Sequence, residues 1–135
     1  MEKFDLVVIG AGPSGYAAAM RSLDFGKRTL VIEKDKVGGA GVTNGALSSK
    51  TWWELSRDTA SFRKNLTRFD IQIPSINYKE IQQEVLQAIQ ERKGMLEEHL
   101  QMMKESHFSD LLSFYKGKAS LLSQHEIVFD TAEGP

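Results

Sequence analysis

The sequence predicts an α/β fold, in which a parallel sheet opens with a βαβ unit and is completed by a long helix and a few further strands. Residues 4–9, FDLVVI, form a largely aliphatic run that stops at Gly10, as in a parallel strand buried on both faces. Residues 15–25 are rich in Ala, Met and Leu, as expected for a helix, and Gly26 is a plausible end for it. Residues 28–33 form the second strand.

A glycine-rich turn joins the first strand to this helix. Residues 10–15 read GAGPSG, a GxGxxG motif in the position that a dinucleotide-binding turn requires. The first glycine allows a tight turn, the second leaves bare backbone for a pyrophosphate, and the third lets helix and strand approach closely. The helix N-terminus adds free N–H groups and a partial positive charge. The motif predicts a Rossmann-like unit with cofactor contacts at Gly10, Gly12, Pro13, Ser14 and Gly15.

An acidic residue ends the second strand. Glu33 follows Gly15 by eighteen residues, and a carboxylate in this place accepts hydrogen bonds from ribose hydroxyls. Lys34 is a further candidate contact beside it. FAD and NAD domains share this unit, so these residues leave that choice open, but the carboxylate disfavours the 2′-phosphate of NADP. The alternatives are a solvated strand end at Glu33 and a glycine turn that holds no ligand.

A segment of small residues, GGAGVTNGALSSK, occupies positions 38–50. With the glycine turn and Glu33, it resembles the FAD segment of the pyridine nucleotide-disulfide oxidoreductases, the family of dihydrolipoamide dehydrogenase and soluble NAD(P) transhydrogenase. That family continues with a double glycine, a redox-active Cys-x4-Cys pair and Pro-Ser-Lys. Gly38 and Gly39 match the double glycine, and residues 48–50 match the tripeptide with Ser48 in place of proline. The resemblance implies FAD as cofactor, contacted by Gly38 and Gly39, and NAD(P)H as co-substrate.

The two cysteine positions of that family fall on Gly41 and Ala46, and the chain has no cysteine. A disulfide relay is therefore excluded. The resemblance implies an FAD-dependent oxidoreductase that passes electrons to another acceptor, such as a second nicotinamide, a quinone, a dye or oxygen. It also implies that Lys50 is a catalytic residue near flavin N5, whereas an exposed pair with Glu54 is the plainer interpretation. The alternative function is a degenerate, non-catalytic module that binds a flavin or nucleotide.

The residue pattern in the second half of the chain predicts helices followed by strands. A helical pattern begins at Ala46, and Pro74 interrupts it. Residues 77–106 predict one long helix. We expect it to pack on the helix before it, because charged residues and a glycine interrupt the seam that a coiled coil requires.

Short strands are expected at residues 112–115, 118–122 and 126–130, with Gly117 separating the first two. The family resemblance extends here, since its Gly-x-Ala element matches Gly117 and Ala119. It implies that backbone at Ala119 meets the adenine of the cofactor. A plain hairpin turn at Gly117 is the alternative.

The amino-acid composition limits the classes of binding partner and the cellular compartment that can be expected. Seventeen basic and eighteen acidic residues leave a formal charge of −1, and no basic cluster suggests nucleic acid or an anionic membrane as a partner. The longest apolar run near the start covers residues 6–9, too short for a signal segment or a membrane span, so a cytoplasmic protein is expected. The three histidines lack the spacing of a metal site, and no metal is expected.

We expect residues 1–135 to be the N-terminal part of an FAD-binding domain. In the resembling family the chain continues with a nicotinamide domain and a dimerisation domain, neither of which lies within these residues. The resemblance therefore implies a homodimer that forms through a domain absent here.

Overall fold

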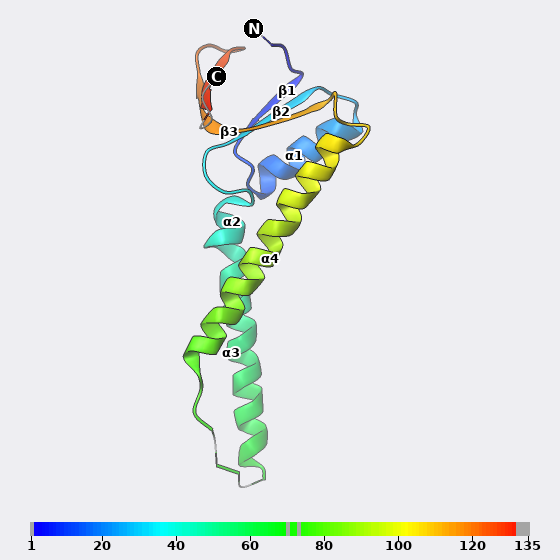
Figure 1. Ribbon diagram of the computed structural model, residues 1–135. Helices are drawn as coiled ribbons and strands as arrows, with labels where there is room; N and C mark the ends of the chain where they lie inside the picture. Colours follow the sequence, from blue (N-terminus) through cyan, green and yellow to red (C-terminus); the bar gives the residue numbers. More distant parts are fainter. Residues whose placement is uncertain (1, 70, 73, 132–135) are drawn as a thin grey trace.

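The computed structural model describes residues 2–69, 71–72 and 74–131. It has an α/β body, from which two long helices extend as an arm (Figure 1). The elements of the body are β1 (Leu6–Ile9), α1 (Pro13–Asp24), β2 (Thr29–Glu33), β3 (Leu112–Leu121) and β4 (Ile127–Thr131). The elements of the arm and its root are α2 (Gly39–Thr43), α3 (Ala46–Thr67) and α4 (Tyr78–Glu105).

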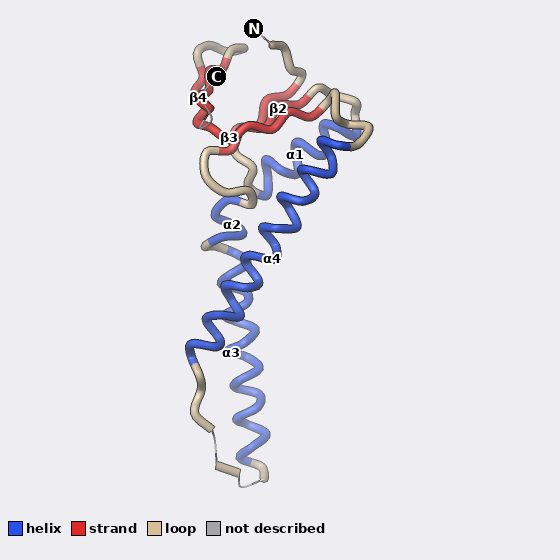
Figure 2. Tube along the Cα trace, in the orientation of Figure 1, coloured by secondary structure: helices blue, strands red, loops and turns tan. Residues whose placement is uncertain are grey.

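The four strands form one sheet in the order β1-β2-β3-β4 (Figure 2). β2 pairs in parallel with both β1 and β3, whereas β3 pairs with β4 in antiparallel fashion. All five residues of β2 are buried, as expected for a central strand. The predicted βαβ opening is therefore confirmed, and α1 begins at Pro13, two residues earlier than expected.

The predicted break at Gly117 is wrong, because β3 runs through it as one strand of ten residues. Up to Lys116 the strand pairs with β2, and from Gly117 onward it pairs with β4. A Cβ atom at Gly117 would lie 2.1 Å from the carbonyl oxygen of Asp130. Glycine is needed here for the close approach of two backbones at a change of partner, and not for a turn.

The main core lies between one face of the parallel strands and the two helices α1 and α4 (Figure 1). Each of these elements supplies apolar side chains that are almost fully buried. The cluster consists of Val8, Ala11, Ala19, Leu23, Val31, Val37, Val42, Leu96, Leu100 and Leu112. Two of its members, Leu96 and Leu100, belong to the C-terminal half of α4, which anchors the arm to the body.

The side chains of the arm are buried much less than those of the body. The predicted packing of the long helix on the helix before it is confirmed, since α3 and α4 lie side by side (Figure 2). Trp52, near the start of α3, stacks on Tyr78 at the start of α4, with ring centroids 5.4 Å apart. α4 thus begins beside the first half of α3. None of the 22 residues of α3 is buried.

Within the described part of the chain, every helix is too short or too polar to cross a membrane.

Candidate functional site

The glycine turn has the geometry that the motif predicts. Gly10 adopts a left-handed backbone with φ of 98°, and its N–H donates to the carbonyl oxygen of Ile32 at 2.7 Å. A Cβ atom at Gly15 would lie 1.9 Å from the carbonyl oxygen of Gly10 and 3.0 Å from Val8 Cγ1. At Gly12, by contrast, a Cβ atom would meet nothing within 4 Å. Gly15 therefore allows α1 to contact the strand, while Gly12 presents bare backbone to open space.

The N-terminus of α1 faces the same turn. Gly12 is the N-cap and Pro13 occupies the first helical position, where the missing N–H has no consequence. The first intrahelical hydrogen bond runs from the N–H of Tyr16 to the carbonyl oxygen of Gly12 at 2.8 Å. No side chain in the described residues caps the N–H groups before it. The first turn, with Ser14 exposed at its surface, is therefore available to an anion.

Glu33 ties the end of β2 to the glycine turn. Its side chain is 7% exposed, and its Oε2 accepts a hydrogen bond from the backbone N–H of Ala11 at 2.6 Å. Its Oε1 accepts a second one from the N–H of Asp35 at 2.8 Å. An ionised carboxylate has about four acceptor sites, so about two remain for ligand hydroxyls.

The short helix α2 packs against the turn and was not predicted. The N–H of Gly38 donates to the carbonyl oxygen of Ala11 at 2.8 Å, and a Cβ atom at Gly39 would lie 3.1 Å from Gly12 Cα. Gly38 has a φ of 92°, and a Cβ there would lie 2.9 Å from Val42. The double glycine therefore fits a place where neither the backbone angle nor the space suits a side chain.

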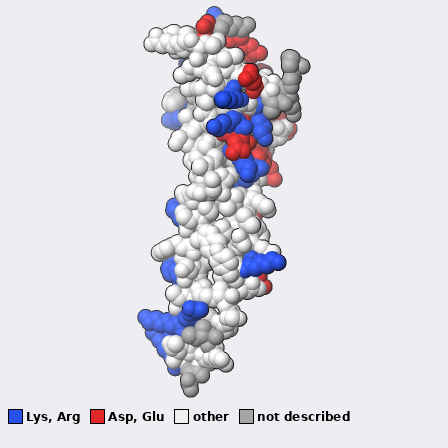
Figure 3. Space-filling model, turned by 90° about the vertical axis from the view of Figure 1, so that its left-hand side faces the viewer, with Lys and Arg blue, Asp and Glu red and all other residues white. Residues whose placement is uncertain are grey.

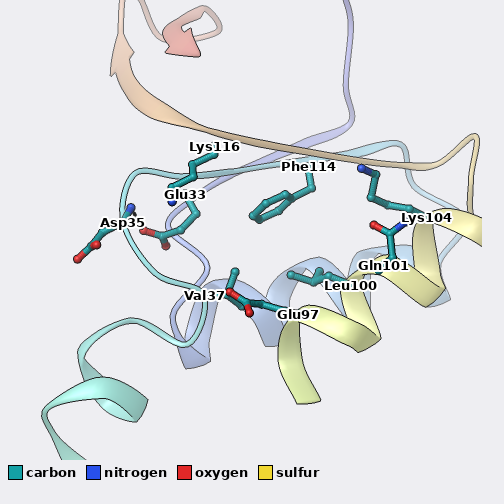
Figure 4. Close-up of a pocket in the computed structure, with 9 residues that line it drawn as sticks. All are labelled: Glu33, Asp35, Val37, Glu97, Leu100, Gln101, Lys104, Phe114 and Lys116. Carbon is teal, nitrogen blue, oxygen red and sulfur yellow. Dashed lines mark hydrogen bonds between the residues drawn. The ribbon is translucent and has the colours of Figure 1, made fainter. Parts of the chain in front are cut away.

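A small cavity of about 170 Å³ lies beside Glu33, at the carboxyl end of β2 and next to the middle of β3 (Figure 4). The strand register places Lys116 opposite Glu33, and α4 supplies the far wall. Acidic and basic side chains mix around an apolar floor. The lining residues are Glu33, Asp35, Val37, Glu97, Leu100, Gln101, Lys104, Phe114 and Lys116. Figure 3 shows charges of both signs gathered over the body end of the molecule.

Three predicted contacts are not among the residues that line this cavity. Lys34 is exposed just beyond β2. Ala119 lies three residues beyond Lys116 on β3, opposite Phe129 of β4. Lys50 lies on the second turn of α3 with its side chain exposed, and in the described residues it forms no ion pair with Glu54. The structure brings together the glycine turn, Glu33 and the double glycine, but no described hydrogen bond joins Lys34, Lys50 or Ala119 to them.

The sequence did not predict the contact between α1 and α4 that Tyr16 and His99 form. The phenol oxygen of Tyr16 and His99 Nδ1 form a hydrogen bond across 83 positions of sequence. Burial raises the pKa of Tyr16 above its ordinary value of 10.0, and the positive charge of Arg92 partly offsets this rise. Tyr16 is therefore protonated at neutral pH and holds α4 against the first turns of α1.

The arrangement suits a phosphate-containing ligand with ribose hydroxyls. Bare backbone at Gly12 and an uncapped helix N-terminus are suited to a phosphate group, and a carboxylate with spare acceptor sites lies at the neighbouring strand end. In the described residues, no group of three or more His, Asp or Glu side chains could hold a metal ion.

Comparison with known proteins identifies the relatives of the chain. A family model described as FAD dependent oxidoreductase matches residues 5–130. The chain is 28% identical over 133 residues to a dihydrolipoyl dehydrogenase of Bacillus subtilis strain 168, covering 96% of this chain and 27% of that protein. It is also 28% identical over 127 residues to a soluble pyridine nucleotide transhydrogenase of Hahella chejuensis, covering 93% and 26% respectively. The chain thus spans about a quarter of the length of these relatives.

A solved structure supports the fold. LpdA of Mycobacterium tuberculosis superposes with a TM-score of 0.73 at 23% identity, covering 96% of this chain and 28% of that one. At this identity the likeness concerns the arrangement of helices and strands alone.

Proposed function

The chain belongs to the FAD-dependent oxidoreductases, and from this premise we propose that the protein is an NAD(P)H oxidoreductase whose electron acceptor is not a protein disulfide. The observation that carries the proposal is the absence of cysteine from a segment that otherwise keeps the features of its relatives. Gly41 and Ala46 occupy the positions of the redox pair, so this chain offers no thiol to accept electrons. Transhydrogenase-like or diaphorase-like activity is the expected class.

The residues present fit FAD. The N–H groups at the start of α1 and the bare backbone at Gly12 suit the pyrophosphate, with the double glycine packed behind the turn. Glu33 keeps acceptor sites for ribose hydroxyls. FAD, when bound, supplies two-electron hydride chemistry at its isoalloxazine.

Lys50 and Ala119 complete the proposed site. The exposed ammonium of Lys50 is free of the ion pairs found among the described residues, so it can provide positive charge where a reduced flavin carries negative charge. Ala119 lies on β3, three residues beyond the Lys116 that pairs with Glu33, and its backbone is proposed to meet the adenine. Both assignments rest on the family resemblance of their motifs.

The full-length protein is proposed to contain further domains outside residues 1–135. Residues 1–135 act as the N-terminal part of an FAD-binding domain, and the nicotinamide site and the homodimer contacts lie in other domains. A cytoplasmic location is part of the same proposal.

A competing function is a module that binds flavin or nucleotide without catalysis, and the loss of both thiols favours it. Retention of the glycine turn, Glu33 and the double glycine favours the enzyme. A loss of function that replaced the two cysteines alone, and retained every other feature of the binding segment, is the less economical explanation.

The test is spectroscopic and uses the full-length protein. Purified protein should show bound flavin absorbance, and NADH or NADPH added without air should bleach it. Return of the absorbance on adding a thionicotinamide analogue would identify transhydrogenation, and return with a quinone or dye would identify diaphorase activity. Bound flavin that no nicotinamide reduces would support the non-catalytic module, and a protein that binds no FAD would overturn the proposal.

A further inference from the structure

We propose that Lys116 is a positioning residue of the cofactor site, whose ammonium group holds the Glu33 carboxylate in place and stabilises its charge when ribose hydroxyls cover it. Lys116 acts through Glu33 and does not bind the ligand itself. The identity of the ligand rests on the proposed function, whereas the relation between the two side chains does not.

Lys116 lies directly opposite Glu33 in the sheet. The two residues are partners in the parallel register of β2 and β3, and they form the last pair of that ladder. Partners in such a register project from the same face of a sheet. Both side chains accordingly line the same small cavity, and Figure 4 shows the side chain of Lys116 extending over the carboxylate of Glu33.

The backbone of Lys116 is held from both sides, while its side chain is free to move. Up to Lys116 the strand pairs with β2, and from Gly117 onward it pairs with β4. The Lys116 side chain is exposed, and none of the ion pairs among the described residues includes it. Its ammonium group can therefore respond to whatever occupies the cavity.

The cavity contains more acidic than basic side chains. Its lining includes three carboxylates and two ammonium groups, those of Glu33, Asp35, Glu97, Lys104 and Lys116. Glu33 is the buried one among these charged residues. Lys104 lies in the last turn of α4, and in Figure 4 the ring of Phe114 stands between it and Glu33. Lys116 is therefore the cation on the Glu33 side of the cavity.

Ligand binding should make this balance of charge important. Glu33 accepts from two backbone N–H groups and keeps about two acceptor sites. Ribose hydroxyls at these sites would displace the water that hydrates the carboxylate, and an ionised group without water needs an opposite charge beside it. The carboxylates of Asp35 and Glu97 have the wrong sign for this. Lys116 supplies the compensating charge from the position where the strand register holds it.

The test uses the full-length protein and measures the Kd for FAD and for ADP, which carries the adenosine ribose and pyrophosphate without the flavin. The variants are Lys116→Met, Lys116→Arg, Glu33→Gln and the double variant Lys116→Met/Glu33→Gln. Lys64→Met is the matched control, since it removes the same charge near the far end of α3. Hydrogen exchange at the Ala11 amide, which donates to Glu33 Oε2, reports on the carboxylate without ligand.

We expect Lys116→Met to raise both Kd values about fivefold, the size of one partly exposed charge pair. The increase should shrink at high salt, and Lys116→Arg should bind as wild type does. In the Glu33→Gln background the carboxylate charge is gone, so Lys116→Met should add almost nothing there. Exchange at the Ala11 amide should be faster in Lys116→Met and unchanged in Lys64→Met.

Wild-type Kd values and wild-type Ala11 exchange in Lys116→Met would overturn the inference. So would a fivefold effect that persists in the Glu33→Gln background, because Lys116 would then contact the ligand directly. If wild type binds ADP but not FAD, the proposed function fails, and the ADP measurements still decide the role of Lys116. A protein that binds neither nucleotide would overturn both.

Discussion

The body and the arm of this molecule use their apolar residues in different ways. All five residues of β2 in the body are buried, whereas none of the 22 residues of α3 in the arm is. Large apolar side chains remain in solvent along the arm, with Phe62 54% and Leu86 52% exposed. Burial of apolar area is the main favourable term in folding. The body therefore contains most of the stabilising burial, and the glycine turn and Glu33 of the proposed cofactor site lie in it.

One helix belongs to both regions. α4 contributes Val85 to the arm, and Leu96 and Leu100 to the body core. Stability should therefore fall off along α4 from its C-terminal end toward Tyr78. Substitutions of similar chemistry in the two regions test this difference.

The largest effect is expected from Gly15→Ala in the body. The new Cβ would lie 1.9 Å from the carbonyl oxygen of Gly10, so α1 must separate from β1, with a loss of stability on the order of 5 kcal/mol. Urea unfolding measures it. Gly12→Ala is the control, since its Cβ meets open space: it should keep the fold and weaken FAD binding. Equal stability of Gly15→Ala and wild type would contradict the close packing described.

Leu23→Ala should have the next largest effect. Leu23 is 1% exposed in the core, and removing such a side chain typically lowers the free energy of unfolding by about 2–5 kcal/mol. The same change at Leu86 in the arm, which is 52% exposed, should lower it by less than about 1 kcal/mol. Similar losses at the two positions would remove the distinction between body and arm.

Glu33→Gln should lower stability by about 1–3 kcal/mol. The carboxylate accepts from two backbone N–H groups, but glutamine has one carbonyl oxygen and would turn its NH2 toward one of these donors. Faster hydrogen exchange at the Ala11 amide and a higher Kd for FAD should accompany the loss. Glu54→Gln, at an exposed position on α3, should change neither quantity.

Lys50→Ala tests the junction between the two regions. If its charge stabilises the reduced flavin, nicotinamide should reduce the flavin about tenfold more slowly, equal to about 1.4 kcal/mol, with little change in FAD affinity. Stopped-flow absorbance without air measures the rate. Lys64→Ala, near the far end of α3, is the control. An unchanged rate in Lys50→Ala would rule out its proposed role.

The smallest effect is expected from Tyr16→Phe, which removes the hydrogen bond to His99 at about 0.5–1.5 kcal/mol. Because the pKa of Tyr16 is raised above 10.0 in the folded state, its stabilising contribution is complete below pH 10. It is lost as the pH rises through the raised pKa. The stability difference between wild type and Tyr16→Phe should therefore shrink above about pH 10. A constant difference between pH 8 and pH 11 would show that the phenol does not titrate as described.

Local sequence signals predicted the opening of the fold well. The apolar runs that end at Gly10 and Glu33 identified β1 and β2, and α3 begins at Ala46 as expected. The helix α2 was missed because glycine is a poor helix former, and the residues that hold this helix lie outside it, in the glycine turn. The predicted break at Gly117 is wrong because the contact of this residue with Asp130 cannot be seen from neighbouring residues.

The sequence likewise predicted part of the candidate site. The motif identified the turn and Glu33, whose positions depend on adjacent elements. Lys116 and the α4 residues around the cavity are not predicted by the sequence. The approach of Lys116 to Glu33 depends on the register of β3 against β2, and that of the α4 residues depends on how α4 packs on the sheet. Strand register becomes visible only once distant segments pair.

The pairing of β2 with β3 also bears on how fast the molecule folds. Pairing of Glu33 with Lys116 closes a loop of residues 34–115, and non-local pairings of this kind slow folding. Helix hairpins form from local contacts, so the arm can shorten that loop before the sheet closes. Substitutions that loosen α3 from α4 should then act mainly by slowing folding and leave the unfolding rate almost unchanged, which gives the weakly buried arm a kinetic role in the assembly of the body.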